Sequence, residues 1–204
     1  RFKFGKNWAK FLENLDDIKI NHALTDIQEM LNLDNLEGKS FLDIGSGSGL
    51  HSLCAQKLGA KKIHSFDFDT DCVNCTAELK HRYFPEQESW TIEQASVLNE
   101  DYLKSLGSFD IVYSWGVLHH TGEMYKALEL AASMLKPGGI LFISIYNDQG
   151  DFSKLWHFIK KVYVHSPGLI KFLMCFSISF LYEVMIALLK LVKLQNPLPF
   201  KEWQ

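Results

Sequence analysis

Hydrophobic and polar positions along the first 146 residues follow two alternating periods. Short apolar or alternating runs, which are typical of strands, occupy residues 39–44, 62–67, 90–95, 109–114 and 140–146. Between them, apolar residues spaced three and four apart indicate amphipathic helices at residues 50–58, 70–83, 99–106 and 123–135. Strands that alternate with helices in this way predict an α/β fold, a doubly wound and mostly parallel sheet with helices on both faces.

Helical periodicity also precedes this α/β core, which we place at residues 39–148. In the N-terminal segment, residues 1–38, apolar positions 8, 11, 12 and 15 fall on one helical face, and residues 22–31 form a second helix. This segment is predicted to pack against the core or to act as a lid over a ligand. Within the core, the Lys-Pro-Gly-Gly stretch at residues 136–139 predicts a sharp turn into the last strand, because proline and glycine end a helix.

The chain changes character in the C-terminal segment, residues 149–204. Residues 151–164 are amphipathic, a Pro-Gly pair breaks the helix, and residues 169–194 are strongly apolar. The uncharged part of that run, residues 172–182, is shorter than a bilayer span. Three interpretations stay open for the run: a cover on the sheet or an oligomer interface, a lid over an apolar substrate, and a contact with a membrane surface.

Three glycines at every second position follow the first predicted strand. Residues 41–50 read Phe-Leu-Asp-Ile-Gly-Ser-Gly-Ser-Gly-Leu, in which an apolar run ends in Asp43 and a helix begins near Leu50. Such a turn leaves bare backbone N–H groups at a helix N-terminus, where a carboxylate or another electron-rich group binds. Asp43 beside the turn would accept from a cation. A ligand with both an ammonium and a carboxylate, such as an amino acid, therefore fits the pair.

The Asp-x-Gly-x-Gly-x-Gly spacing of residues 43–49 resembles the first motif of class I S-adenosylmethionine-dependent methyltransferases. A dinucleotide-binding loop would instead need G-x-G-x-x-G, and the residue at that last position is Leu50. Two further anchors carry the resemblance at workable spacing: Asp67 at the end of the second strand, and the segment from Leu-His-His at residues 118–120 to the Lys-Pro-Gly-Gly stretch. This last anchor is similar to the ubiquinone- and menaquinone-type branch of the class.

The resemblance implies S-adenosylmethionine as the cofactor and assigns residues to its parts. The methionine end is assigned to Asp43, Gly45, Ser46, Gly47 and Gly49, the ribose to Asp67, the adenine to Phe68, Ser96, Val97 and Leu98, and the surroundings of the sulfur to Ser114 and Trp115. A carboxylate at the ribose accepts from two hydroxyls at once. One departure stands at Ser96, where the family commonly has an aspartate that accepts from the adenine amino group. The family's sheet usually ends in two further strands, but only helical patterns follow Tyr146, so these strands either lie beyond Gln204 or are replaced by helices.

Imidazole groups stand where a general base would be useful. His119 and His120 follow the fourth predicted strand, and imidazole titrates near neutral pH. Either is predicted to take a proton from an acceptor hydroxyl, and the alternative is that it caps or braces the loop. Tyr146, Asn147 and Asp148 follow the fifth strand and face the same edge by topology, and a carbon or amine acceptor would need no base.

Composition narrows the expected partners and location. The 204 residues carry a net charge of −3 and no large cluster of lysine or arginine, so no nucleic-acid partner is expected. Four cysteines are too few for a secreted disulfide framework, which favours a reducing, cytoplasmic location, and the start at Arg1 shows no signal-peptide pattern. Cys72 and Cys75 are expected to be buried thiols, not a redox pair or half of a metal site, and no metal site is predicted.

Together these features predict a methyltransferase that acts on a small, apolar or lipid-linked acceptor. A second hypothesis is a non-catalytic, cofactor-binding subunit that regulates a partner through the helices at residues 150–194. A nicotinamide-dependent oxidoreductase is disfavoured because position 50 is leucine.

Overall fold

The computed structural model describes residues 5–147 and 149–193, and the chain divides into two compact units at residues 1–146 and 147–204. The described part of the first unit holds a five-stranded parallel sheet in the order β3-β2-β1-β4-β5. Its strands are β1 (Ser40–Ile44), β2 (Lys62–Asp67), β3 (Trp90–Gln94), β4 (Phe109–Trp115) and β5 (Leu135–Ser144). Its helices are α1 (Gly5–Glu13), α2 (Asp17–Leu31), α3 (Leu50–Lys57), α4 (Thr70–Tyr83), α5 (Glu100–Leu106) and α6 (Met124–Ser133), with a 3-10 turn at Leu118–His120. This arrangement confirms the predicted α/β fold.

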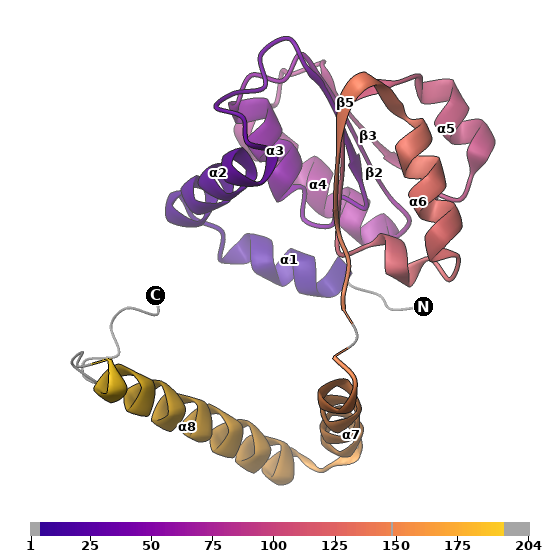
Figure 1. Cartoon of the computed structure of the whole chain (residues 1–204). Coiled ribbons are helices and arrows are strands. Elements are labelled where there is room, and N and C mark those ends of the chain that lie inside the picture. Colours follow the sequence, from indigo (N-terminus) through magenta and orange to yellow (C-terminus); the bar gives the residue numbers. More distant parts are fainter. Residues whose placement is uncertain (1–4, 148, 194–204) are drawn as a thin grey trace. The chain divides into compact units, whose positions relative to one another are not determined.

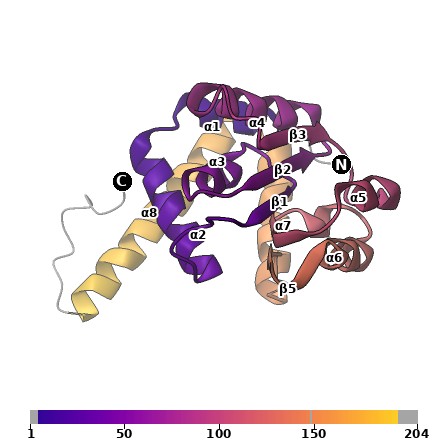
Figure 2. The same ribbon diagram turned by 90° about the horizontal axis from the view of Figure 1, so that it is seen from above.

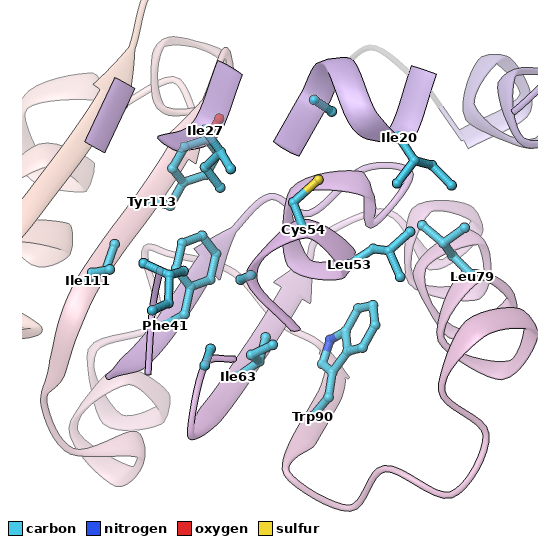
Figure 3. Close-up of a cluster of buried hydrophobic side chains, with 14 of the residues drawn as sticks. Ile20, Ile27, Phe41, Leu53, Cys54, Ile63, Leu79, Trp90, Ile111 and Tyr113 are labelled. Carbon is cyan, nitrogen blue, oxygen red and sulfur yellow. The ribbon is translucent and has the colours of Figure 1, made fainter. Parts of the chain in front are cut away.

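Two apolar clusters cover the two faces of the sheet. Helices α1 to α4 lie on one side and α5 and α6 on the other (Figure 1 and Figure 2). Phe41 belongs to the first cluster and Leu42 to the second, because successive side chains of a strand point to opposite faces. Figure 3 shows the first cluster, in which strand residues meet helix residues; among those labelled are Phe41, Ile63, Ile111, Ile20, Ile27 and Leu53.

Helix ends in this unit are set by local side chains. The Asp16 carboxylate accepts from the backbone N–H of Lys19 and starts α2, and Asn32 ends it in the left-handed conformation with φ of 52°. Asp69 and Asn99 start α4 and α5 in the same way as Asp16. These polar residues supply acceptors for the N–H groups that have no partner in the first turn of a helix. Helix α4 therefore begins at the predicted residue, and α5 begins one residue after its predicted start.

The fifth strand differs from the expectation. The turn predicted at residues 136–139 lies inside β5, which starts at Leu135 opposite Phe109 and then shifts register, so that Ile140 pairs with Ile111. Gly138 has a positive φ of 77° in this irregular stretch. Proline and glycine mark a bulge in an edge strand as readily as a turn, because an edge position does not require the missing N–H. The sequence pattern alone does not distinguish these two structures.

A charged group ties the amino-terminal edge of the sheet together around this bulge. The Asp110 carboxylate accepts from the backbone N–H and the hydroxyl of Ser40, at 2.8 and 2.6 Å, and from Lys136 Nζ at 2.8 Å. The hydrogen bond from Lys136, followed by those from Ser40, holds the pKa of Asp110 below its usual 3.8. The Lys136 side chain of the Lys-Pro-Gly-Gly stretch thus links β5 to β4 and β1.

Asp110→Asn is expected to lower the free energy of unfolding by about 1–2 kcal/mol at pH 7, because charge-assisted hydrogen bonds at a partly exposed site are replaced by neutral ones. Because the pKa of Asp110 is lower in the folded than in the unfolded state, the ionised carboxylate stabilises the folded protein above about pH 4. This stabilisation is lost as the pH falls through the folded-state pKa. Urea unfolding of both proteins at pH 7 and pH 3 measures this. The exposed Asp101→Asn serves as control, and a gap that persists unchanged at pH 3 would contradict the assignment.

The second unit is helical over its described residues. Helix α7 (Asp151–His165) and helix α8 (Gly168–Val192) are separated at Ser166 and Pro167, as the Pro-Gly break predicted. No described residue of either helix is buried. By length and composition α8 qualifies to cross a membrane. The predicted segment 1–38 belongs to the same unit as the α/β core. The division between the two units falls after residue 146, two residues before the predicted boundary at 148.

Candidate functional site

The glycine loop, residues 45–49, joins β1 to α3 at the carboxyl end of the sheet. Strand β1 lies between β2 and β4, so the loop sits where the strand order reverses, the position at which open α/β sheets bind ligands. The backbone N–H of Gly45 donates to the Phe66 carbonyl at 2.8 Å, and the Ser114 hydroxyl donates to the Ile44 carbonyl at 2.9 Å. Neighbouring strands thus fix both the start of the loop and its direction.

Two of the loop's glycines are required by close neighbours. Gly49 has a φ of 82°, and a Cβ there would lie 2.9 Å from Thr76 Cα on the backbone of α4. Gly47 has a φ of 56°, and a Cβ there would lie 2.9 Å from Trp8 Nε1. A side chain at position 49 would clash with the backbone of α4, one at position 47 would displace the Trp8 indole, and both positions have a backbone conformation that only glycine adopts readily. The glycines therefore let α4 and the indole of Trp8 approach the bare main chain.

Asp67 at the end of β2 faces the loop. One carboxylate oxygen accepts from the backbone N–H of Gly47 at 3.0 Å, and the other accepts from Asp69 N–H at 2.9 Å. Burial raises the pKa of Asp67 above its usual 3.8, and these backbone donors oppose that shift. The structure thus brings together two of the residues predicted for one ligand, which are separated by twenty positions in the chain.

Asp43 lies at the back of the loop and is only 3% exposed. Its carboxylate accepts from the Ser52 hydroxyl at 2.5 Å, Ser52 lies 2.7 Å from Ser65, and the Trp90 indole donates to Ser65 at 2.8 Å. Burial raises the pKa of Asp43 to about 7; the Ser52 hydrogen bond opposes the shift and the charge of Asp67 adds to it. Two mutually repelling carboxyl groups therefore stand beside the loop, at the ends of adjacent strands.

The residues predicted to hold an adenine ring lie at the ends of β2 and β3. Phe68 is 49% exposed, while Val97 is buried. The Ser96 hydroxyl accepts from the backbone N–H of Leu98 at 3.2 Å, so it shapes the turn that follows β3. The Gln94 amide donates to the Phe68 carbonyl at 3.2 Å and joins the two loops.

The end of β4 presents aromatic rings. Ser114 is fully buried, and its hydroxyl donates to β1. Trp115 is 44% exposed and stacks on Phe142 of β5, with ring centroids 5.9 Å apart. His51 on α3 lies 5.9 Å from the Trp115 ring, and burial lowers its pKa to about 4. Trp115 and Phe142 thus form an aromatic wall on β4 and β5, and the neutral imidazole of His51 on α3 lies beside it.

The two histidines after β4 pack against each other and against Tyr146. The ring centroids of His119 and His120 are 4.0 Å apart, and that of Tyr146 is 4.4 Å from His119. Both ring nitrogens of His119 are buried without a hydrogen-bond partner among the described residues. Burial and the neighbouring His120 lower the pKa of His119, which favours the neutral, proton-accepting imidazole. Asn147 belongs to the second unit, and Asp148 lies outside the described residues.

The sequence pattern missed two parts of this site. Trp8 belongs to a segment that was predicted to pack on the core or to act as a lid, but its contact with the loop was not predicted: its indole lies on Gly47, and residues Ser46 to Gly49 are buried. The other part is the Ser46–Thr76 hydroxyl pair at 2.9 Å, which connects the loop to α4. Ser46 belongs to the glycine motif, but Trp8 and Thr76 stand in no motif, so only spatial proximity identifies their contacts with the loop.

The cysteines of the Cys72-x-x-Cys75 pair are free and buried, as predicted, and burial raises the pKa of both thiols. Within the described residues, no three His, Cys, Asp or Glu side chains gather in a way that could hold a metal ion.

Comparison with known proteins supports the class of protein that the glycine loop predicted. The solved structure of magnesium protoporphyrin IX methyltransferase from Synechocystis PCC 6803 with bound S-adenosylhomocysteine (SAH) matches with a TM-score of 0.55 at 20% identity, over 74% of this chain and 64% of that chain. The chain is 28% identical over 156 residues to the tRNA U34 carboxymethyltransferase of Campylobacter curvus, which covers 72% of this chain and 50% of that protein. It is 30% identical over 112 residues to the ubiquinone biosynthesis O-methyltransferase of Brucella melitensis biotype 2, over 55% of this chain and 43% of that protein.

The fold is therefore that of the class I S-adenosylmethionine-dependent methyltransferases, which confirms the resemblance predicted from the glycine loop. The model of the methyltransferase domain family matches residues 17–173, and the chain belongs to that family. The chain spans about half the length of the curated relatives that it matches.

Proposed function

We propose that this protein transfers a methyl group from S-adenosylmethionine to a small acceptor that is apolar or linked to a lipid. The observation that carries the proposal is the hydrogen bond from the Gly47 N–H to the Asp67 carboxylate, in a loop whose three glycines have positive φ and in a chain of the methyltransferase domain family. An aromatic wall and two histidines at the end of β4 add the surroundings that a methyl acceptor would need.

The residues around the loop fit the parts of this cofactor. The bare peptide groups of Gly45 to Gly49 and the acid Asp43 suit the amino acid end, which carries both charges. The Asp67 carboxylate can accept from both hydroxyls of a diol once its hydrogen bond from the Gly47 N–H is broken. Phe68 and Val97 supply flat and apolar surface for the base, with Ser96 and Leu98 in the turn beside them. Ser114 anchors β4 to β1 and so places Trp115 at the end of the strand.

Bound S-adenosylmethionine supplies an electrophilic methyl group, and the protein aligns the acceptor and excludes water. The partly exposed Trp115 and Phe142 provide an apolar face for this alignment. His119 is the proposed base for a hydroxyl acceptor, since its neutral ring has two buried nitrogens without a partner in the described chain. His120 lies against it and disfavours its protonation.

A ligand that lies against Gly47 needs the place now taken by the Trp8 indole. Helix α1 therefore has to shift or its indole has to rotate when the cofactor enters. The backbone N–H of Gly5 donates to the carboxylate of Asp69, the N-cap residue of α4, at 3.4 Å, which is a long and therefore weak hydrogen bond. This supports the predicted lid role of the N-terminal segment.

Titration calorimetry of the purified chain with SAH tests the cofactor assignment directly. We expect saturable binding of one SAH per chain, together with a rise in melting temperature, because a ligand that binds only the folded state stabilises it. NADH and adenosine serve as comparison ligands and are expected to bind more weakly than SAH. Absence of both heat and a melting shift with SAH, or a preference for NADH, would contradict the proposal.

A second candidate is a cofactor-binding subunit without catalysis of its own. Helices α7 and α8, which have no buried residue among those that the structure describes, favour it because they offer a large apolar surface for a partner. Methyl transfer from radiolabelled S-adenosylmethionine to any quinone-type phenol or lipid extract by the isolated chain would reject this candidate. Transfer to RNA instead would contradict the predicted absence of a nucleic-acid partner.

A further inference from the structure

Helix α8 has the length of a bilayer span. An 18-residue window of it reaches a mean hydropathy of 2.1, and none of that window is buried. At 1.5 Å per residue, its 25 residues extend about 37 Å, and the 19 steps from Lys171 to Lys190 extend about 29 Å. The hydrocarbon core of a bilayer is about 30 Å thick, so the two lysines are spaced to reach its two surfaces. The uncharged run of residues 172–182 is shorter than a span, but the whole helix is not.

The apolar surface of α8 extends around the entire helix. Phe172, Phe176 and Phe180 stack along one side, with centroids 6.4 and 6.3 Å apart. Leu181 stands nine residues after Phe172, which places it on the opposite side of the helix, and both are about two-thirds exposed, at 67% and 65%. A helix on the surface of a soluble domain carries one apolar stripe and one polar face. Helix α8 has no such polar face and needs an apolar environment on all sides.

Helix α7 has the opposite, two-sided pattern. Phe152, Trp156, Ile159 and Tyr163 follow one another at helical spacing along one side. Lys154 and Lys161 lie on the opposite side of the helix, and Lys160, four residues after Trp156, lies at the border between the two sides. An amphipathic helix with aromatic residues on one face and lysines on the other is typical of the boundary between headgroups and acyl chains.

The charge of these helices complements an anionic membrane. Residues 149–193 contain six lysines and two acids, whereas the whole chain has a net charge of −3. Basic residues next to an apolar helix are attracted to anionic headgroups. The single acid of α8 is Glu183, seven residues from Lys190, which places it about 10 Å from that lysine along the axis and about 4 Å from the midpoint between Lys171 and Lys190. A carboxyl group at that depth is costly unless its side chain reaches toward the surface.

Surroundings other than a bilayer account for less of the apolar surface of α8. A second copy packed on α8 would cover one stripe, because paired helices touch along one face, and would leave the opposite side exposed. A soluble core helix would be mostly buried, and the described α8 has no buried residue. We propose that helices α7 and α8 anchor this protein in a lipid bilayer, with α8 embedded among the acyl chains and α7 at the interface.

Vesicle flotation of the full chain tests this anchor. The protein is purified in detergent, reconstituted with vesicles of phosphatidylcholine and phosphatidylglycerol in a 3:1 ratio, and spun through a density gradient; we expect it to float and to stay bound in high salt and in alkaline carbonate. The double variant Phe180→Lys/Leu181→Lys places two charges near the middle of α8 and is expected to lower the floating fraction at least about tenfold. Ile18→Lys adds a charge at an exposed apolar position of α2, 68% exposed, and is expected to float like the parent chain.

Several outcomes would overturn the proposal. Release by salt alone would indicate an electrostatic contact at the surface, and a stable dimer that does not float would indicate a protein interface. Circular dichroism of the double variant checks that it still folds; if it does not, protection of Cys175 on α8 from a water-soluble maleimide in parent-chain vesicles gives the same answer, and full labelling without detergent would reject embedding. SAH binding by the same preparation reports separately on residues 1–146, so failure of the anchor and failure of the proposed methyl transfer are distinguishable.

Discussion

Asp43→Asn is expected to raise the stability of this protein at pH 8 and to leave it unchanged at pH 4. In the folded chain, burial raises the pKa of Asp43 from 3.8 to about 7. Between these two values the folded state holds a proton that the unfolded state releases, so the stability of the parent protein falls as the pH rises through this window and is lowest above pH 7. Three pKa units correspond to roughly 4 kcal/mol, which is an upper limit.

Asparagine removes the buried charge and still offers an oxygen to the Ser52 hydroxyl. We therefore expect a gain of roughly 2–4 kcal/mol at pH 8, or about 5–10 °C in melting temperature for a chain of this length. Melting curves between pH 4 and pH 8 measure the effect. Asp34→Asn, at an exposed position, is the matched control. A variant that is less stable than the parent at pH 8 would show that the Asp43 charge is satisfied in the folded protein.

The same substitution is expected to weaken SAH binding, since the proposed partner of the ligand's ammonium is lost. Stability and affinity would then move in opposite directions, which is typical of a residue kept for function at a cost in stability. Equal SAH affinity of Asp43→Asn and the parent at pH 8 would remove Asp43 from the proposed site while leaving the stability prediction in place.

Asp67→Ala is expected to lower SAH affinity roughly a hundredfold. The proposed carboxylate accepts two hydrogen bonds from a diol, and each such charge-assisted bond contributes on the order of 1.5–3 kcal/mol. Titration calorimetry at pH 8 measures the loss. The parent's affinity is further expected to decline on acidification, because burial raises the pKa of Asp67 and protonation removes an acceptor.

Asp69→Asn is the matched control for this experiment. Asp69 lies two residues away, caps α4 by accepting from Asp71 N–H, and does not bond to Gly47. Asparagine caps helices as well as aspartate does, so SAH affinity should change little. Equal losses in Asp67→Ala and Asp69→Asn would point to a general disturbance of the β2–α4 connection, and an unchanged affinity of Asp67→Ala would exclude Asp67 from the cofactor site.

Local patterns predicted most of the secondary structure because strand and helix periods depend on near neighbours. Strand β2 and helix α4 have the bounds that the sequence predicted, residues 62–67 and 70–83. The pattern failed at residues 136–139, where proline and glycine form a bulge inside β5. The difference lies in Lys136, which reaches Asp110 on another strand, and a contact 26 residues away leaves no local signal.

The features of the candidate site likewise divide into those set by local sequence and those set by long-range contacts. The sequence by itself determined the glycine loop, the acid at the end of β2 and the histidines after β4, because positive φ, strand ends and imidazole chemistry belong to single residues and short motifs. Only the tertiary structure decided that Asp43 is a buried acid with a raised pKa and that Trp8 lies on Gly47. Burial and repulsion between charges depend on which distant segments pack together, and the order of strands in the sheet sets that packing.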